Sequence, residues 1–339
     1  MNFIITVIVM IIKIFIITQI FFLLPIPLTW FERKVAGHIQ QRPGPMRVGP
    51  HGILQAVADA IKLMFKEDTI PAKSDKWLFI LAPLIALVPP FAVFVTVPVG
   101  EDIMIPYINY NLTFYVADFN VGILYVLAIS GLSLYGVIFG GWASNSKYAM
   151  LGSLRSVASM ISYEVAMTFA AVGVVMMTGS LSLVDMVDSQ AGSILNWNIF
   201  YLPVGPAWFV VFLIAGTAEV NRIPFDLAED EGTLAAGFFV EYSAMKFSLF
   251  ALAEYTAMIS VSILTVIMFF GGWHGPIPLP IPPVIWFCVK VFCFIYFFMW
   301  MRFTLPRYRY DQLMFIGWKI LIPVSLFLVL LTGLMKIFL

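Results

Sequence analysis

Long apolar segments are the feature that most constrains how this chain can fold. An α-helix needs about 20 mostly apolar residues to cross a bilayer. Only 11% of the 339 residues are charged, whereas a soluble domain usually carries about a quarter. We therefore predict an all-α polytopic membrane protein that forms a single integral membrane domain over residues 1–339. Eight transmembrane helices are expected, at about 3–28, 77–99, 119–142, 157–179, 206–222, 247–272, 284–301 and 315–337.

Basic residues are distributed unevenly among the connections between these segments. Sixteen of the 19 Lys and Arg residues lie in alternate connections, at 29–76, 143–156, 219–247 and 302–319. The intervening connections contain acidic residues but no Lys or Arg. Because short loops rich in Lys and Arg stay in the cytoplasm, the basic connections are predicted to be cytoplasmic and both termini to lie on the outer side.

Sequence motifs for bound cofactors are absent from the chain. It has no P-loop, no GxGxxG after a strand and no cluster of Cys and His ligands. Cys288 and Cys293 are five residues apart in an apolar run, a spacing that fits neither a disulfide framework nor a metal site. The 19 basic residues equal the 19 acidic ones, which gives no basic surface for nucleic acid. We expect the chain itself to bind no nucleotide, flavin, iron–sulfur cluster, metal or nucleic acid, and to act within the membrane or with partner proteins.

The connection 29–76 contains a predicted amphipathic helix at 51–66. Its apolar residues recur at helical spacing, while charged residues occupy the rest of the helical wheel. Such a helix lies along the cytoplasmic membrane interface. Periodicity alone favours a surface anchor, and the alternative is a lip over an opening through which an apolar substrate enters from the lipid. The apolar positions are Ile53, Val57, Ile61, Met64 and Phe65.

Two carboxylates are predicted to lie deep in the membrane. Glu164 is nine residues after Arg155, and Glu254 is eight after Lys246, which places them roughly 13 and 12 Å into their helices. An ionised carboxylate at such depth is costly unless a proton or a cation joins it. Proton transfer is therefore the favoured interpretation, with hydrogen bonding that locks helices together as the alternative.

The connection after the fifth segment adds more acidic residues. Residues 219–242 contain six Asp and Glu against the single Arg222, which is abnormal on a side of the bundle that is otherwise basic. Interleaved Ile, Leu and Phe residues predict partial burial, and crowded carboxylates of this kind titrate as a coupled set. The acidic residues are Glu219, Asp226, Glu229, Asp230, Glu231 and Glu241.

Basic residues within or beside the apolar segments carry separate expectations. Lys290, about 18 Å before Arg302 by helix rise, either pairs with an acid or reaches out of the membrane. Lys13 is expected to reach toward the outer face. Arg307 and Arg309 are expected to be ordinary cytoplasmic anchors, with partner docking as the alternative.

Sequence motifs along nearly the whole chain resemble those of the H-subunit family of proton-translocating NADH:quinone oxidoreductase, respiratory complex I. They occur in the same order as in that family, each in the expected segment or connection. The motifs are FERK (31–34), RPGP (42–45), ADAIKL (58–63), GWASNSKYA (141–149), ISYEV (161–165), EVNRIPFDL (219–227), VEY (240–242), AEY (253–255) and PRYRYDQLM (306–314).

The resemblance implies a role that composition does not show. It implies a subunit of the bacterial plasma membrane that forms the membrane side of a quinone chamber and couples quinone reduction to proton translocation. Quinone and membrane lipid would be its small-molecule partners. Its protein partners would be peripheral-arm subunits with iron–sulfur clusters and the quinone site, together with small membrane subunits. At 233 the chain has Thr where that family usually has Glu.

The same resemblance assigns roles to individual residues. It implies a proton-coupling set of Glu164, Glu219, Asp226, Glu229, Glu231, Glu241 and Glu254. It implies a quinone chamber and entrance with Arg42, Asp59, Lys62 and Arg222. Two other functions remain open: the membrane anchor of a related energy-converting hydrogenase, and a stand-alone ion channel or transporter.

Overall fold

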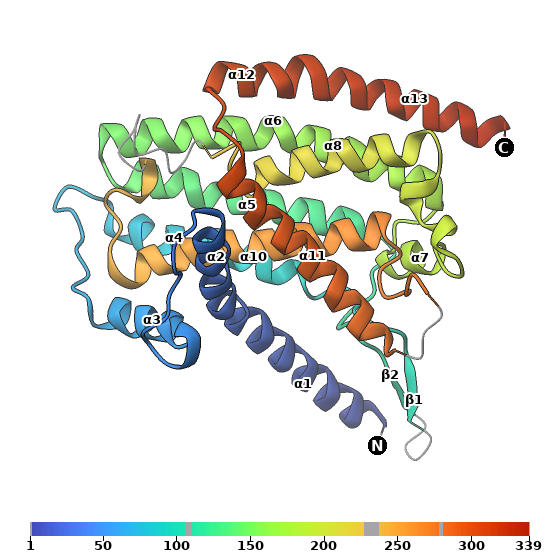
Figure 1. Ribbon diagram of the computed structural model, residues 1–339, viewed down its shortest axis with the longest axis horizontal. Coiled ribbons are helices and arrows are strands. Elements are labelled where there is room, and N and C mark those ends of the chain that lie inside the picture. Colours follow the sequence, from blue (N-terminus) through green and yellow to red (C-terminus); the bar gives the residue numbers. More distant parts are fainter. Residues whose placement is uncertain (1, 106–109, 227–236, 278–280, 339) are drawn as a thin grey trace.

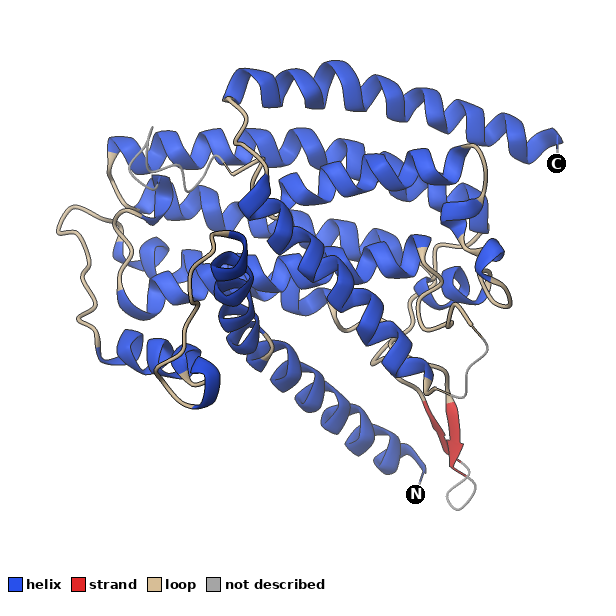
Figure 2. Ribbon diagram, viewed as in Figure 1, coloured by secondary structure: helices blue, strands red, loops and turns tan. Residues whose placement is uncertain are grey.

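The computed structural model describes residues 2–105, 110–226, 237–277 and 281–338, and it confirms the predicted all-α class. Within these ranges the only strands are β1 (Ile103–Ile105) and β2 (Tyr110–Leu112), which form a small antiparallel hairpin (Figure 2). The helices are α1 (Asn2–Leu23), α2 (Pro25–Ile39), α3 (Gln55–Phe65), α4 (Lys76–Val93), α5 (Gly122–Ala143), α6 (Lys147–Thr178), α7 (Leu183–Asp188), α8 (Val204–Glu219), α10 (Ala244–Phe269), α11 (Pro283–Thr304), α12 (Tyr310–Phe315) and α13 (Ile322–Phe338).

Seven helical stretches of the described chain are long and apolar enough to cross a membrane, which makes this a multi-pass membrane protein. Two of these stretches combine helices that follow each other, α1 with α2 and α12 with α13. The eighth expected segment, 206–222, corresponds to α8, an apolar helix of 16 residues. At 1.5 Å per residue α8 is about 24 Å long, shorter than the usual bilayer core of about 30 Å. The count of eight crossings therefore stays a prediction.

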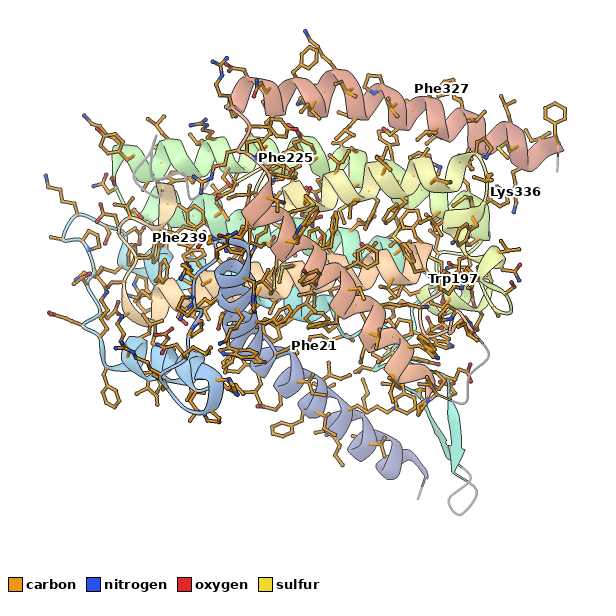
Figure 3. The ribbon with its side chains drawn as sticks, viewed as in Figure 1. Phe21, Trp197, Phe225, Phe239, Phe327 and Lys336 are labelled. Carbon is orange, nitrogen blue, oxygen red and sulfur yellow. The ribbon has the colours of Figure 1, made fainter. Side chains whose placement is uncertain are left out.

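Helix α10 is the centre of the bundle. In its most apolar stretch 78% of the residues are buried, against 11% for the first crossing. Helices α3, α4, α8 and α11 pack against it, and α6 lies next to α5, α8 and α13 (Figure 1). Helix α1 and helix α13 lie at the periphery, and Phe327 of α13 points away from the bundle (Figure 3).

The two ends of the bundle differ in their loops. The basic end, on the left in Figure 1, carries α3 and the connecting residues 40–54, 66–75, 144–146, 220–226, 237–243 and 305–309. The distal end carries α7, the hairpin and the connecting residues 179–182, 189–203, 270–277 and 281–282, and both chain termini lie on this side (Figure 1). This arrangement agrees with the predicted alternation of basic connections.

The predicted amphipathic helix is present as α3 and begins four residues later than expected. A turn at Pro50–Gly52 precedes it. Helix α3 packs on α2 and α10 and leaves much of its apolar surface exposed, with Met64 65% and Phe65 87% accessible. This exposure is typical of a helix that faces lipid at the membrane surface.

Buried amides hold the distal end together. The Gln190 Nε2 group donates to the carbonyl oxygens of Met186 and Ile267, at 2.9 Å each. Its Oε1 accepts from the backbone N–H groups of Gly271 at 3.0 Å and Asn198 at 3.2 Å. A neutral amide thereby satisfies backbone groups of three segments that would otherwise be buried without partners.

The contacts of Lys290 differ from both expectations, which were pairing with an acid and reaching out of the membrane. Its Nζ donates to the carbonyl oxygens of Phe270, Gly272 and His274 at 2.6, 3.0 and 2.5 Å, and lies 4.3 Å from the centre of the Trp197 ring. Backbone oxygens and an aromatic face thus solvate the ammonium group in place of an acid or bulk water.

Lys13 reaches toward the distal end, in the direction predicted for it. Its Nζ donates to the hydroxyl of Thr113, directly after β2, at 2.6 Å. The long side chain therefore carries its charge along α1 to the polar groups next to the hairpin.

Candidate functional site

Five side chains from four separate parts of the chain meet in a buried charged cluster. Arg222, in the turn after α8, is 2% exposed. Its Nη1 donates to Glu32 Oε1 of α2 at 2.8 Å, and its Nε forms an ion pair with Glu254 Oε1 of α10 at 2.6 Å. Arg302 of α11 also pairs with Glu32, and the Tyr255 hydroxyl donates to Glu32 Oε2 at 2.7 Å. We term these residues the arginine–glutamate cluster.

Charge balance explains how these groups can be buried together. Two carboxylates face two guanidinium groups, and buried charges are tolerated when they are paired and hydrogen-bonded. Burial opposes the charged form of Arg222, but the carboxylates of Glu254 and Glu32 outweigh it and raise the pKa of Arg222 well above its ordinary value. The Tyr255 ring, 4.9 Å from the guanidinium carbon, adds a cation–π contact.

A large cavity of about 600 Å³ opens beside this cluster. Helices α2, α3, α10 and α11 supply its walls, and all five members of the cluster lie at its surface. Apolar side chains form much of the remaining lining. A concave, largely apolar cavity with a few convergent polar groups is the usual form of a small-molecule site. The apolar lining includes Pro25, Ile26, Ala36, Ala56, Leu63, Phe247, Ala251, Leu252 and Phe303.

A second, small cavity of about 60 Å³ also has Glu254 in its lining. Glu219 and Asn221 contribute polar groups to its lining, as does Ser133. Because a single water needs about 10–15 Å³ of such space and a few polar partners, this cavity can hold water. Glu254 is a lining residue of both the large cavity and the small one.

Glu219 and Glu164 continue this line of acidic groups. Glu219, the last residue of α8, has a buried Oε2 with no hydrogen-bond partner in the described structure. Glu164 of α6 is close enough to interact electrostatically with Glu219. Its Oε1 lies against Gly131 of α5, where an added Cβ would be 2.5 Å away, so a larger residue at 131 would displace this carboxylate.

Asp226 has a different environment from the other predicted acids. It is 3% exposed, and Arg307 Nη2 lies 3.1 Å from its Oδ2. The backbone N–H of Tyr308 donates to the Pro224 carbonyl at 3.1 Å, which fastens the same two segments together. Arg307 was expected to be an ordinary anchor. The structure adds that Arg307, still 42% accessible, pairs with a buried carboxylate of its own chain.

The remaining predicted site residues fall into three groups. Arg42 and Asp59 line the large cavity, and Asp59 pairs with Arg33 at 2.5 Å. Lys62 is exposed on α3 and does not belong to the described lining, and Glu241 lies in the turn before α10, away from both cavity linings. The other predicted acids lie outside the described residues, as does the departure at 233; they are Glu229, Asp230, Glu231 and Thr233.

Sequence reasoning missed three members of the cluster. Glu32 and Tyr255 belong to the FERK and AEY motifs, which carry the family resemblance but received no role of their own. Arg302 was counted among the cytoplasmic basic residues. One signal in the sequence could have identified Glu32. It follows the first apolar segment closely, and an acid in a helix that extends from such a segment needs a cation partner wherever it is shielded from water. The structure shows that the helix does continue, because α2 extends to Ile39.

Metal-ligating side chains do not gather in the described ranges. Within them no group of three or more His, Cys, Asp or Glu side chains is arranged to hold a metal ion. Cys288 and Cys293 are free thiols on the exposed surface of α11. The form and lining of the large cavity suit the binding of an apolar molecule with polar groups at one end.

Comparison with known proteins gives a consistent result. The family model described as NADH dehydrogenase matches residues 12–333. The H 2 subunit of NADH-quinone oxidoreductase from Rhizobium meliloti (strain 1021) is 57% identical over 325 residues, 96% of each chain. The corresponding H 2 subunit from Rhizobium etli is 57% identical over 95% of this chain and 92% of its own, and that from Geobacter sulfurreducens is 51% identical over 90% of each. The chain therefore belongs to the NADH dehydrogenase family.

Proposed function

We propose that the chain is a membrane subunit of an NADH–quinone oxidoreductase and supplies the membrane side of its quinone chamber. The relatives named above carry that description, and they match this chain over nearly its whole length. In this proposal NADH oxidation and the iron–sulfur clusters belong to partner subunits in a peripheral arm, and small membrane subunits adjoin the bundle. The chain acts as one integral membrane domain of the bacterial plasma membrane with its basic end in the cytoplasm.

The large cavity is the proposed position of the quinone. A quinone combines an apolar ring and tail with two carbonyl oxygens that accept hydrogen bonds. The volume of about 600 Å³ lies within the range of about 300–1,000 Å³ typical of ligand pockets. Its apolar walls suit the ring and the tail, while Arg222 and Tyr255 offer polar contacts. Helix α3, with exposed apolar side chains facing lipid, is the proposed entrance, with Arg42, Asp59 and Lys62 along it.

Charge created in this chamber provides the proposed coupling. Reduction of a quinone to quinol consumes two electrons from the partner subunits and two protons, and negative charge develops before the protons arrive. At an effective dielectric constant of about 20, two charges 8 Å apart interact by roughly 2 kcal/mol. An interaction of this size changes the proton occupancy of a buried carboxyl group when water can reach it.

The single observation that supports this coupling is the position of Glu254. It is paired with Arg222 on the side of the large cavity and also borders the small cavity that contains Glu219. New negative charge in the chamber competes for Arg222, so Glu254 takes up a proton. That proton then passes through water in the small cavity to Glu219 and on to Glu164. Asp226, Glu229, Glu231 and Glu241 are proposed to modulate the charge on the cytoplasmic side of this path.

Isosteric removal of the carboxylates tests the proposal. We expect Glu254→Gln and Glu164→Gln to assemble into the complex and to lose proton translocation, because glutamine occupies the same space but cannot exchange a proton with its neighbours. The measurement is the number of protons translocated per NADH oxidised in proteoliposomes, together with the yield of assembled complex.

Asp311→Asn is the matched control. Asp311 is 79% exposed and pairs with the equally exposed Arg309, so its substitution should leave the proton ratio unchanged. Correctly assembled Glu254→Gln and Glu164→Gln complexes that translocate protons like the wild type contradict the proposal.

A further inference from the structure

The turn that joins α8 to the arginine–glutamate cluster has an unusual backbone conformation. Helix α8 ends at Glu219, and Asn221 has a φ of 53°, in the left-handed region that L-residues rarely adopt. The Asn221 N–H donates to the Ala218 carbonyl oxygen at 3.1 Å. The next N–H, that of Arg222, donates to the Thr217 carbonyl oxygen at 3.3 Å. These two bonds define a Schellman motif, in which a left-handed residue ends the helix.

Arg222 directly follows this left-handed residue. Its own N–H is bound to Thr217, and its carbonyl oxygen accepts from the Phe225 N–H at 2.8 Å, so its backbone is fixed on both sides. From this backbone the side chain reaches Glu32 and Glu254, with ion pairs of 2.8 and 2.6 Å. The conformation of the turn therefore determines where the guanidinium group lies relative to both carboxylates.

The side chain of Asn221 fastens the same turn to α6. Its Oδ1 accepts from the Ser156 hydroxyl at 3.4 Å, and its Nδ2 donates to the Met160 sulfur at 3.3 Å. Both are weak contacts, because 3.4 Å is long for a hydrogen bond from a hydroxyl and a thioether sulfur is a weak acceptor. The amide therefore holds the turn less firmly than the backbone bonds do.

Few residue types suit the backbone conformation at position 221. Glycine adopts it readily because it has no Cβ, and asparagine is tolerated because its short polar side chain can form local hydrogen bonds. Most other L-residues would bring their Cβ too close to the following carbonyl oxygen. Such strain is relieved when the turn leaves the left-handed region, and that change displaces Arg222 from its two carboxylates.

We propose that Asn221 is a positioning residue whose left-handed backbone places the Arg222 guanidinium between Glu32 and Glu254. This role rests on the proposed function, because the position of Arg222 matters to a quinone only if the large cavity is the quinone chamber. Asn221 lines the small cavity and, among the described residues, is not part of the wall of the large one. Its influence on the chamber is therefore exerted through Arg222.

Steady-state NADH:quinone kinetics of the assembled complex test the proposal. We expect Asn221→Ala to lower kcat/KM for a short-chain quinone about tenfold, because the cost of the left-handed region for alanine leaves Arg222 in place in only about a tenth of the molecules. Asn221→Gly also lacks the amide but adopts this region readily, so its kcat/KM should stay within about twofold of the wild type. Rescue by glycine separates the backbone conformation from the side chain.

Asn145→Ala is the matched control. Asn145 also has a positive φ, of 49°, in the connection between α5 and α6, and its Nδ2 donates to the Lys73 carbonyl oxygen at 3.0 Å. It is exposed and lies outside the described linings of the large and small cavities. The substitution brings the same backbone strain without displacing a charged group of the cluster, so kcat/KM should stay within about twofold of the wild type.

A double-mutant cycle separates positioning of Arg222 from general destabilisation. In the Arg222→Met background there is no guanidinium group to place, so Asn221→Ala should lower the residual kcat/KM by less than about twofold. A further tenfold loss in that background overturns the proposal. So do equal losses in Asn221→Ala and Asn221→Gly, or a wild-type kcat/KM in Asn221→Ala. If Asn221→Ala does not assemble, Asn221→Ser replaces it, and its kcat/KM must fall below that of Asn221→Gly.

Failure of the proposed function would give a different result. Wild-type proton translocation by Glu254→Gln and Glu164→Gln contradicts the coupling but leaves the turnover ratios of the Asn221 variants unaffected. Wild-type turnover of Arg222→Met contradicts the quinone chamber and, with it, the role of Asn221. A large loss in Arg222→Met beside an unaffected Asn221→Ala overturns the positioning role alone.

Discussion

The basic end and the distal end of this bundle both contain buried charges but stabilise them differently. At the basic end Arg222 is shared between two carboxylates next to a cavity, so a change of charge nearby can redistribute the ion pairs. At the distal end Lys290 is held by three backbone carbonyl oxygens that cannot titrate or move independently. The comparison teaches that a buried charge is a candidate for function when its partners are themselves titratable, and a structural element when they are backbone.

The Arg222→Met substitution should give the largest effect. It leaves the Glu254 carboxylate buried without its cation, and breaking a buried ion pair costs about 3–5 kcal/mol. We expect a lower thermal midpoint of the assembled complex and a loss of most quinone reductase activity. Differential scanning fluorimetry and NADH:quinone turnover measure these effects.

The double variant Arg222→Met/Glu254→Gln sharpens that test. Removing the orphaned carboxylate should recover part of the stability but none of the proton translocation. A single Arg222→Met variant with wild-type stability is incompatible with a shared arginine at the centre of the cluster.

The Lys290→Met substitution is the counterpart at the distal end. It removes three hydrogen bonds to backbone carbonyl oxygens, and we expect a loss of about 2 kcal/mol, because relief of charge burial offsets part of the lost bonds. Quinone turnover and the proton ratio should stay within twofold of the wild type. Lys336→Met is the matched control, since Lys336 binds a single carbonyl oxygen, that of Met177 at 3.0 Å, at the end of α13 (Figure 3). A Lys290→Met complex that is stable but fails to translocate protons would contradict the purely structural role assigned to the charge at the distal end.

The Asp59→Asn substitution should have the smallest effect on stability. The Arg33–Asp59 pair is partly exposed, with 52% and 31% of the two side chains accessible, and such pairs contribute about 0.2–1 kcal/mol. Because Asp59 lines the large cavity, we expect the KM for a short-chain quinone to change while kcat stays near the wild-type value. Steady-state kinetics of Asp59→Asn beside Asp311→Asn, an exposed acid outside the cavity, separates the two effects. An unchanged KM places Asp59 outside the path of the quinone.

The fold could be predicted largely from local sequence properties. Apolar length predicts the crossings, and the alternation of basic connections agrees with the placement of both termini at one end. Apolar length does not decide whether the short helix α8 crosses the membrane, because its 16 residues fall below the usual length of a crossing. Length and hydropathy are properties of single segments, so no knowledge of tertiary contacts is needed to use them.

The candidate site could be predicted only in part. Glu164 and Glu254 were identified because a charge in an apolar segment is conspicuous in a sequence. Glu219 was noted as one of the acids of the connection 219–242, and the family resemblance alone assigned Arg222 to the chamber. Glu32 was not identified, because its importance depends on Arg222, which is 190 residues away in the chain. Pairing of this kind is decided by how α2, α10 and α11 pack, and a single sequence does not contain that information.

The most direct test of the central claim is to observe the protonation of a buried carboxyl group when the quinone is reduced. Redox-triggered infrared difference spectra of the assembled complex report the C=O stretch of protonated carboxyl groups. We predict a change in this region on quinone reduction that disappears in Glu219→Gln and persists in Asp311→Asn. Identical carboxyl spectra for Glu219→Gln and the wild type would contradict the proposed coupling, since the path from Glu254 to Glu164 would then carry no proton at Glu219.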